Sequence, residues 1–205
     1  MTNVAKTSPR VFAVVPAAGR SRRMGADKQL LEYAGRPMLR GLLETLEGSR
    51  VEAICLVTRK AISDRLDLAG LSKTVTAYNE DAASEMIDSI RIGIAELEKR
   101  QALRAGDGVL VCPGDHAGIA VAEFDRCVDA FRARPDRIVV AERRGRRGHP
   151  IIFPGELVEY VRSAACDGGL NALSRAYARL LSAVECESPG VTRDVDTPAD
   201  YESLS

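Results

Sequence analysis

Cationic side chains follow a turn of small residues near the start of the chain. The small residues are Pro16-Ala17-Ala18-Gly19, and the cations after them are Arg20, Arg22, Arg23 and Lys28. Small residues let a backbone come close to a ligand, so that backbone N–H groups and cations converge on one polyphosphate. The segment matches neither the P-loop pattern nor the G-x-G-x-x-G dinucleotide pattern. It therefore indicates an anion-binding loop of another type, with a solvated connection between two elements as the alternative.

Carboxylates occur at two places that are suited to a divalent cation. Asp115 directly follows an apolar run that is typical of a buried strand, and Asp194 and Asp196 alternate as residues on one face of an extended segment do. Mg²⁺ prefers one or two carboxylates together with substrate phosphates and water. The alternatives are that Asp115 forms a turn with its own backbone and that Asp196 or Thr197 caps a helix with Pro198 in its first turn.

The remaining polar candidates are two histidines and a run of arginines. His116 adjoins Asp115, whereas His149 lies at the end of RRGRRGHP (143–150), which we expect to be a loop. A lone histidine is more often structural than catalytic, so neither is assigned as a general base. The arginines are not flanked by aromatic residues, which disfavours a nucleic-acid site. A loop that grips a phosphorylated small molecule fits them better, with a solvated loop as the alternative.

Hydrophobic periodicity predicts alternating strands and helices, which places the candidate residues. We expect strands over 11–15, 51–58, 73–78, 107–115, 137–142 and 182–187, and helices over 38–48, 60–69, 84–100, 120–133, 154–164, 169–181 and after 198. This alternation predicts an α/β fold with a largely parallel sheet covered on both faces. In such sheets ligands bind beyond the carboxyl ends of the strands. The cationic loop, Asn79 and Asp115 all lie at such ends.

Composition limits the class of protein. The 205 residues carry 29 cationic and 29 acidic side chains, so overall charge gives no argument for a nucleic-acid or membrane partner. The sequence contains no segment of transmembrane length and no signal-peptide pattern. Its five cysteines form no C-x-x-C pair, which predicts a reducing, cytoplasmic location without disulfides or zinc. We expect a loose tail over 1–9 and a single domain over 10–205.

Taken together, these segments resemble the MobA-like nucleotidyltransferases, and within them the molybdenum cofactor cytidylyltransferase branch. The main match is AAGRSRRMGADKQLL (17–31), and the others are GRPML (35–39), Asn79 with MIDSIRIG (86–93), Asp115, GHP (148–150) and DVDTPADY (194–201). The resemblance implies a three-layer α/β/α fold of the nucleotide-diphospho-sugar transferase type, with a mostly parallel, Rossmann-like sheet. It also implies transfer of CMP from CTP to the phosphate of molybdopterin, with release of pyrophosphate.

The resemblance also assigns roles to individual residues. It implies nucleotide binding by Ala17, Ala18, Gly19, Arg20, Asn79 and Ser89, catalysis by Arg23, Lys28 and Asp115, Mg²⁺ binding by Asp115 and Asp196, and pterin binding by His149. The small residues of the first turn favour CTP over GTP. A molybdoenzyme or its maturation chaperone is the implied protein partner.

Two segments depart from the family pattern on the acceptor side. His116-Ala117 stands where proline is more usual two residues after the aspartate, and 167–171 lacks a family cation. The acceptor is therefore less well defined than the reaction. A sugar or polyol phosphate is the alternative acceptor, and a non-catalytic protein that delivers a nucleotide or pterin is the alternative function. A dinucleotide-dependent oxidoreductase fits the sheet but not the glycine pattern.

Overall fold

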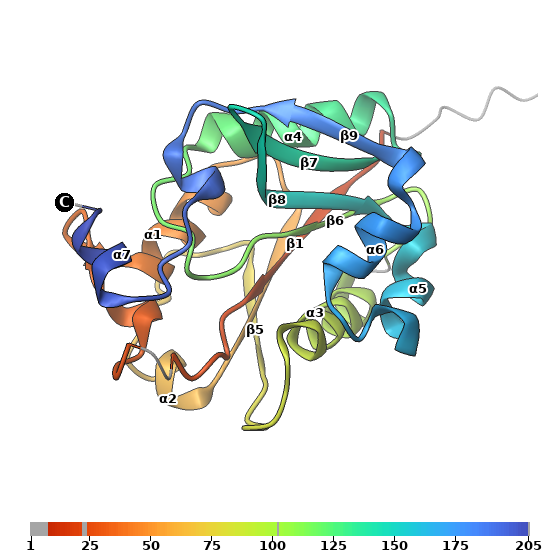
Figure 1. Ribbon diagram of the computed structural model, residues 1–205. Coiled ribbons are helices and arrows are strands. Elements are labelled where there is room, and N and C mark those ends of the chain that lie inside the picture. Colours follow the sequence, from red (N-terminus) through yellow and green to blue (C-terminus); the bar gives the residue numbers. More distant parts are fainter. Residues whose placement is uncertain (1–7, 22–23, 102, 205) are drawn as a thin grey trace, which may run out of the picture.

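The computed structural model describes residues 8–21, 24–101 and 103–204. In this part of the chain seven strands form one sheet in the order β5-β4-β1-β6-β8-β7-β9 (Figure 1). The strands are β1 (Val11–Pro16), β4 (Ala53–Thr58), β5 (Thr74–Tyr78), β6 (Gly108–Val111), β7 (Ile138–Arg143), β8 (Arg146–Pro154) and β9 (Leu181–Glu185). Strand β8 is antiparallel to both of its neighbours, and all other pairs are parallel. A separate small antiparallel pair joins β2 (Glu32–Tyr33) and β3 (Arg36–Pro37).

Helices cover both faces of the sheet, so the molecule has three layers (Figure 1). One face packs against α1 (Met38–Glu47), α2 (Lys60–Ser63) and α4 (Val121–Ala133), and the other against α3 (Met86–Gln101), α5 (Val158–Arg162) and α6 (Leu170–Ala176). A last short helix, α7 (Pro198–Glu202), begins at a capping box formed by Thr197 and Asp200. The predicted α/β fold with a mostly parallel sheet is confirmed.

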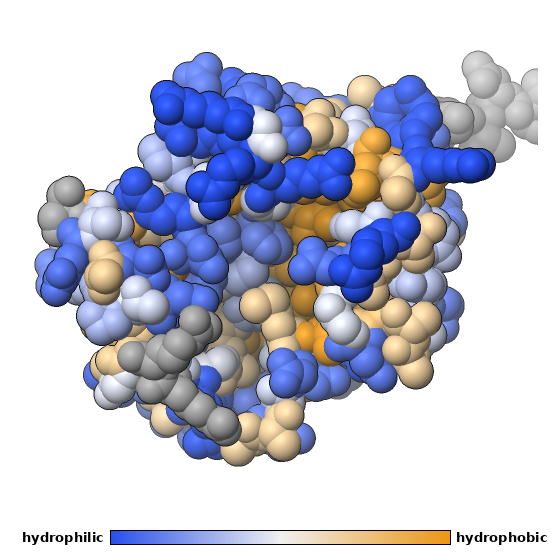
Figure 2. Space-filling model, in the orientation of Figure 1, coloured by the Kyte–Doolittle hydropathy of each residue, from blue (hydrophilic) through white to orange (hydrophobic). Residues whose placement is uncertain are grey.

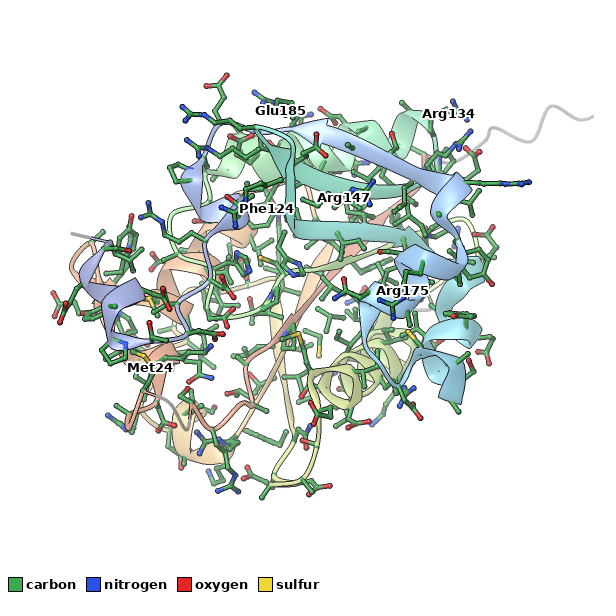
Figure 3. All side chains as sticks on the ribbon, viewed as in Figure 1. Met24, Phe124, Arg134, Arg147, Arg175 and Glu185 are labelled. Carbon is green, nitrogen blue, oxygen red and sulfur yellow. The ribbon has the colours of Figure 1, made fainter. Side chains whose placement is uncertain are left out.

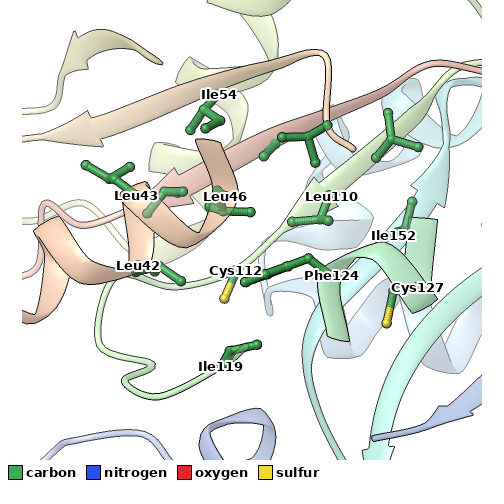
Figure 4. Packing of buried hydrophobic residues seen from close by; sticks show 14 of the residues in the cluster. Leu42, Leu43, Leu46, Ile54, Leu110, Cys112, Ile119, Phe124, Cys127 and Ile152 are labelled. Atoms are coloured by element: carbon green, nitrogen blue, oxygen red, sulfur yellow. The ribbon is translucent and has the colours of Figure 1, made fainter. Parts of the chain in front are cut away.

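The central strand β1 is apolar along its whole length because both of its faces are buried. Val11, Ala13 and Val15 face the layer of α1 and α4, whereas Phe12 and Val14 face the layer of α3. A strand buried on both faces has no polar side to alternate with. Figure 4 shows the first of these cores, where leucines of α1 and Phe124 and Cys127 of α4 lie on the same face of the sheet.

Strand β1 is the point at which the chain moves from one side of the sheet to the other. The chain first adds β4 and β5 on one side of β1 and then crosses over to add β6 on the other side. The chain after β6 stays bonded to the carboxyl end of β1: Gly114 N–H donates to Pro16 O over 3.0 Å. A Cβ on Gly114 would lie 2.8 Å from Cβ of Ala17, so glycine allows the two strand ends to approach this closely. This point is where ligands bind in open α/β sheets.

Some local expectations were wrong. The arginine-rich segment is not a loop: β7 and β8 form a hairpin through Arg144-Gly145, two residues with positive φ, as a two-residue type I′ turn requires. The short apolar run at 151–153 is the end of the nine-residue strand β8. Two of the expected helices are shorter than predicted: turns and a bend follow α2 in the 60–69 segment, and a 3-10 turn (Ala178–Leu180) follows α6 in the 169–181 segment.

The remaining sequence expectations concern the ends of the chain and membranes. The tail expected over 1–9 falls mainly on residues 1–7, which lie outside the described residues. In the described ranges we find no helix that is both long and apolar enough to cross a membrane.

Candidate active site

The small-residue loop after β1 is held in place by a buried glutamine. Gln29 is 2% exposed, and its Nε2 donates to Ala17 O over 3.3 Å and to Gly19 O over 3.1 Å. Ser21 adopts a positive φ of 46°, and its Oγ accepts a 3.3 Å hydrogen bond from the backbone N–H of Lys28. The backbone therefore curls around the Gln29 side chain, and Lys28 is brought back toward the end of β1.

Two residues at the carboxyl end of the neighbouring strand β4 and just after it also hold this loop in place. Thr58 Oγ1 donates to Ala17 O over 3.2 Å, and Arg59 Nε donates to Ala18 O over 3.1 Å. The Arg59 guanidinium also forms an ion pair with Asp27. Three residues that hold this loop were not predicted from the sequence: Gln29, Thr58 and Arg59. Their place at the carboxyl end of a strand beside β1 is the signal that could have indicated Thr58 and Arg59.

Lys28 brings together two predicted site residues that are far apart in the sequence. Its Nζ lies 2.6 Å from Asp115 Oδ2 and 2.7 Å from Asp196 Oδ1. Burial of the ammonium opposes its charge, but the charge and hydrogen bonds of Asp115, followed by those of Asp196, outweigh burial and raise the pKa of Lys28. Lys28 is therefore cationic at neutral pH.

One carboxylate oxygen of Asp115 is an unused acceptor. Its Oδ1 is buried and accepts no hydrogen bond from the described residues. A buried carboxylate oxygen without a partner is costly, and a metal ion would satisfy it. No cluster of three or more His, Cys, Asp or Glu side chains suited to a metal occurs in the described ranges. Two carboxylates fit an ion that takes its other ligands from phosphates and water.

The two aspartates of the 194–196 segment diverge. Only Asp196 contacts Lys28, whereas Asp194 lines a different cavity and Val195 between them is fully buried. The segment is not a strand, so the expectation that both carboxylates share one face was wrong. Asp196 is the one that lies beside Asp115.

A cavity of about 540 Å³ lies beside the loop, above the carboxyl ends of β1 and β6. It is lined by most of the predicted nucleotide and metal residues: Ala17, Ala18, Gly19, Arg20, Lys28, Ser89, Asp115 and Asp196. Residues 81–86 form the opposite wall. We call this the first cavity.

Asn79 lies behind this wall and does not line the first cavity. It is 5% exposed, and its Nδ2 donates to Ser84 Oγ over 3.0 Å and to Ser89 Oγ over 2.9 Å. Ser84 is thus engaged with Asn79 and with Asp81 O, and α3 begins two residues later, at Met86. The structure therefore places Asn79 where it orients Ser89 and the 79–84 loop.

A second cavity, of about 520 Å³, joins the first at Met86, Pro113 and Asp115. Its floor is apolar and is formed by Ile87, Ile90, Val111, Val140 and Ile151. Figure 2 shows this floor as a hollow of hydrophobic surface between hydrophilic projections. The rim is polar and comes from β8, α6 and the 192–194 segment. In Figure 3, Arg147 extends from β8 and Arg175 from α6, the two elements that border this cavity.

Two histidines lie at the inner end of the second cavity. Their ring centroids are 4.8 Å apart with an edge-to-face angle of 68°. His116 Nδ1 lies 2.8 Å from Gly190 O, and His149 Nδ1 lies 3.4 Å from Val111 O. Because a carbonyl only accepts, both rings carry hydrogen on Nδ1. Burial, and next the nearby His116, lower the pKa of His149 to about 4, so the ring is neutral at pH 7.

The backbone packs tightly where His149 enters the cavity. A Cβ on the preceding Gly148 would overlap the backbone of Val191, so only glycine fits between β8 and the 189–192 turn. Of the predicted site residues, Arg23 lies outside the described ranges. The others gather at the two cavities, with Asn79 behind the wall of the first.

The structure is a three-layer α/β protein with two cavities at the carboxyl ends of its strands, and the comparisons give its family. The MobA-like NTP transferase domain matches residues 13–181, and the chain belongs to this family. The purine catabolism protein PucB of Bacillus subtilis (strain 168) is 26% identical, over 96% of this chain and 97% of PucB.

A second relative and a solved structure agree with this assignment. The 2-C-methyl-D-erythritol 4-phosphate cytidylyltransferase of Halorhodospira halophila is 32% identical over 138 residues, which are 64% of this chain and 56% of that enzyme. The crystal structure of Rv0371c from Mycobacterium tuberculosis H37Rv matches with a TM-score of 0.75 and 27% identity, over 95% of this chain and 97% of that one. Rv0371c has also been solved in complex with manganese.

Proposed function

We propose that the protein is a Mg²⁺-dependent cytidylyltransferase that transfers CMP from CTP to the phosphate of molybdopterin and releases pyrophosphate. The observation that carries the proposal is that two cavities of similar size meet at Asp115. One is walled by the phosphate-type loop, and the other has an apolar floor and a polar rim. Two ligands that react with each other need such an arrangement.

The first cavity suits a nucleoside triphosphate. Its wall combines exposed backbone at Gly19 with the cations Arg20 and Lys28. Small side chains at Ala17 and Ala18 leave room for the backbone to approach a base, which supports CTP as the nucleotide. The cytidylyltransferase among the relatives supports the same choice.

Asp115 and Asp196 would hold the metal ion, with Asp115 Oδ1 as the buried acceptor that a cation satisfies. When bound, Mg²⁺ would neutralise charge on the triphosphate and on the departing pyrophosphate. The manganese complex of Rv0371c supports the use of a divalent ion.

The proposed reaction needs no protein nucleophile. A phosphate oxygen of the acceptor attacks the α-phosphorus of CTP, a new P–O bond forms, and the bond to the β-phosphate oxygen breaks in line with it. Lys28, with Arg23 as the second proposed cation, stabilises the charge that develops on the phosphoryl oxygens. Ser89, oriented by Asn79, contacts the nucleoside in this proposal.

The second cavity supports a flat acceptor with an apolar face. Five aliphatic side chains of its floor offer little to the hydroxyl groups of a sugar or polyol, whereas a pterin ring can lie against them. His149, neutral and fixed by Val111 O, then faces the pterin. Arg146 and Arg147 lie at the rim and suit an anionic group of the acceptor.

The erythritol phosphate specificity of the Halorhodospira enzyme makes a polyol phosphate the second candidate acceptor. A cytoplasmic setting, and hand-over of the product to a molybdoenzyme or its chaperone, belong to the main proposal. Non-catalytic delivery of a nucleotide or pterin is the alternative outside the enzyme class.

Pyrophosphate release tests these proposals. The purified protein is mixed with CTP or GTP, Mg²⁺, and either molybdopterin or 2-C-methyl-D-erythritol 4-phosphate. We expect release with CTP and molybdopterin, and loss of release in Asp115→Ala. Release only with the polyol phosphate selects the second acceptor. Tight binding of CTP without release under any condition selects the delivery protein.

A further inference from the structure

The two proposed metal ligands, Asp115 and Asp196, both form an ion pair with the ammonium group of Lys28. Lys28 Nζ contacts Asp115 Oδ2 and Asp196 Oδ1 at 2.6 and 2.7 Å, and the Lys28 and Asp115 side chains are each only 13% exposed. A metal ion held by both carboxylates would lie close to this ammonium group, whichever oxygen of Asp115 it binds. A divalent ion and an ammonium group a few ångströms apart repel each other strongly where water is largely excluded.

We propose that Lys28 is a displaceable resident cation, which holds Asp115 and Asp196 together and leaves them only when metal and nucleotide arrive together. Free divalent metal therefore binds this protein weakly, and nucleotide opens the site to it. This inference rests on the proposed function, because it assigns an order to the binding of the proposed substrates.

The geometry allows Lys28 to move without unfolding the loop. Its backbone is fixed, since its N–H donates to Ser21 Oγ and it begins the 3-10 turn Lys28–Leu30. Its four-carbon side chain lines the first cavity, so rotation about side-chain bonds alone carries Nζ from the carboxylates into that cavity. A triphosphate there supplies the anionic partner that Lys28 loses.

The consequence is a reciprocal coupling between metal and nucleotide. If nucleotide removes Lys28 from the carboxylates, metal affinity rises, and metal must raise nucleotide affinity by the same factor. A purely structural lysine predicts the opposite effect of its removal, because two unsupported carboxylates would separate and bind metal less well.

Binding of Mn²⁺ alone distinguishes the two roles. Free Mn²⁺ is measured by electron paramagnetic resonance in titrations of the full chain without nucleotide. In Lys28→Met we expect Mn²⁺ affinity to rise by about tenfold or more, which corresponds to about 1.4 kcal/mol. Lys60→Met, at an exposed lysine paired with Asp64, is the matched control and should leave the affinity unchanged. Equal or weaker Mn²⁺ binding by Lys28→Met overturns the proposal.

A second measurement uses the unaltered protein. With ¹³C-labelled lysine, the ε-methylene NMR signal of Lys28, assigned through Lys28→Arg, should stay in place when Mg²⁺ is added alone. It should shift when Mg²⁺ is added with a non-hydrolysable CTP analogue. A shift with Mg²⁺ alone contradicts displacement by the metal–nucleotide complex.

These results separate this inference from the proposed function. Pyrophosphate release by the unaltered protein, together with unchanged Mn²⁺ affinity in Lys28→Met, removes only the resident-cation role. Tighter Mn²⁺ binding in Lys28→Met without pyrophosphate release by the unaltered protein removes only the transferase.

Discussion

The Gln29 side chain organises the small-residue loop after β1, so replacing it should weaken nucleotide binding while the protein stays folded. In Gln29→Leu the side chain keeps a similar size but loses both donors to Ala17 O and Gly19 O. Ala17 O still accepts from Thr58, and Gly19 is exposed, so neither carbonyl is left buried without a partner.

The size of the effect follows from the two hydrogen bonds that Gln29 Nε2 donates, because the third lost contact, from Ser21 Oγ to Gln29 Oε1, is long at 3.5 Å. Each of these two hydrogen bonds is worth about 0.5–1.5 kcal/mol. Losing both destabilises the ordered conformation of the loop by about 1–3 kcal/mol. The nucleotide must supply this free energy when it orders the loop, which weakens CTP binding by about 5- to 150-fold. The free energy of unfolding should fall by no more than about 3 kcal/mol, since no cavity is opened in the core.

Isothermal titration with CTP and Mg²⁺ measures the affinity, and urea unfolding measures the stability. The chain's other glutamine gives the control: Gln101→Leu, at the end of α3 and away from both cavities, should leave CTP binding unchanged. CTP affinity of Gln29→Leu equal to that of the unaltered protein would refute the role of Gln29 in ordering the loop.

Three further predictions concern the metal site, the core and the acceptor cavity. Asp115→Asn should reduce pyrophosphate release by about 100-fold or more with an unchanged circular dichroism spectrum, and near-normal turnover would remove Asp115 from the site. In Gly93→Ala the new Cβ would lie 2.5 Å from a Val14 methyl group. Overpacking should cost about 1–3 kcal/mol, which exceeds the gain of about 1 kcal/mol in helix propensity, so the urea midpoint should fall. The control is Gly106→Ala, where a Cβ would meet no atom within 4 Å. By NMR, His149 should titrate with a pKa of about 4, below its usual 6.5. Its contribution to the free energy of unfolding is then present above about pH 6.5 and is lost as pH falls toward 4. Titration near pH 6.5 would show that the imidazole is not desolvated at this position.

Short apolar runs and helical periodicity in the sequence were sufficient to predict the layered fold. Strands such as β1 and β4 are buried on both faces, so their composition alone identifies them. The hairpin of β7 and β8 escaped prediction, because its tip carries arginines that project into solvent and its Arg-Gly turn is not a strong hairpin signal.

The sequence by itself also determined which residues are candidates for the site, because the cationic loop and Asp115 come shortly after apolar runs that are typical of buried strands. It could not determine which carboxylate joins them. Lys28 is 87 residues from Asp115 and 168 residues from Asp196, and only the packing of the C-terminal segment against the sheet brings the three together. The support of the loop by Gln29, Thr58 and Arg59 likewise depends on contacts across strands, for which no local pattern exists. Local composition thus decided the strands and the loop, whereas the pairing of charges was decided by the tertiary structure.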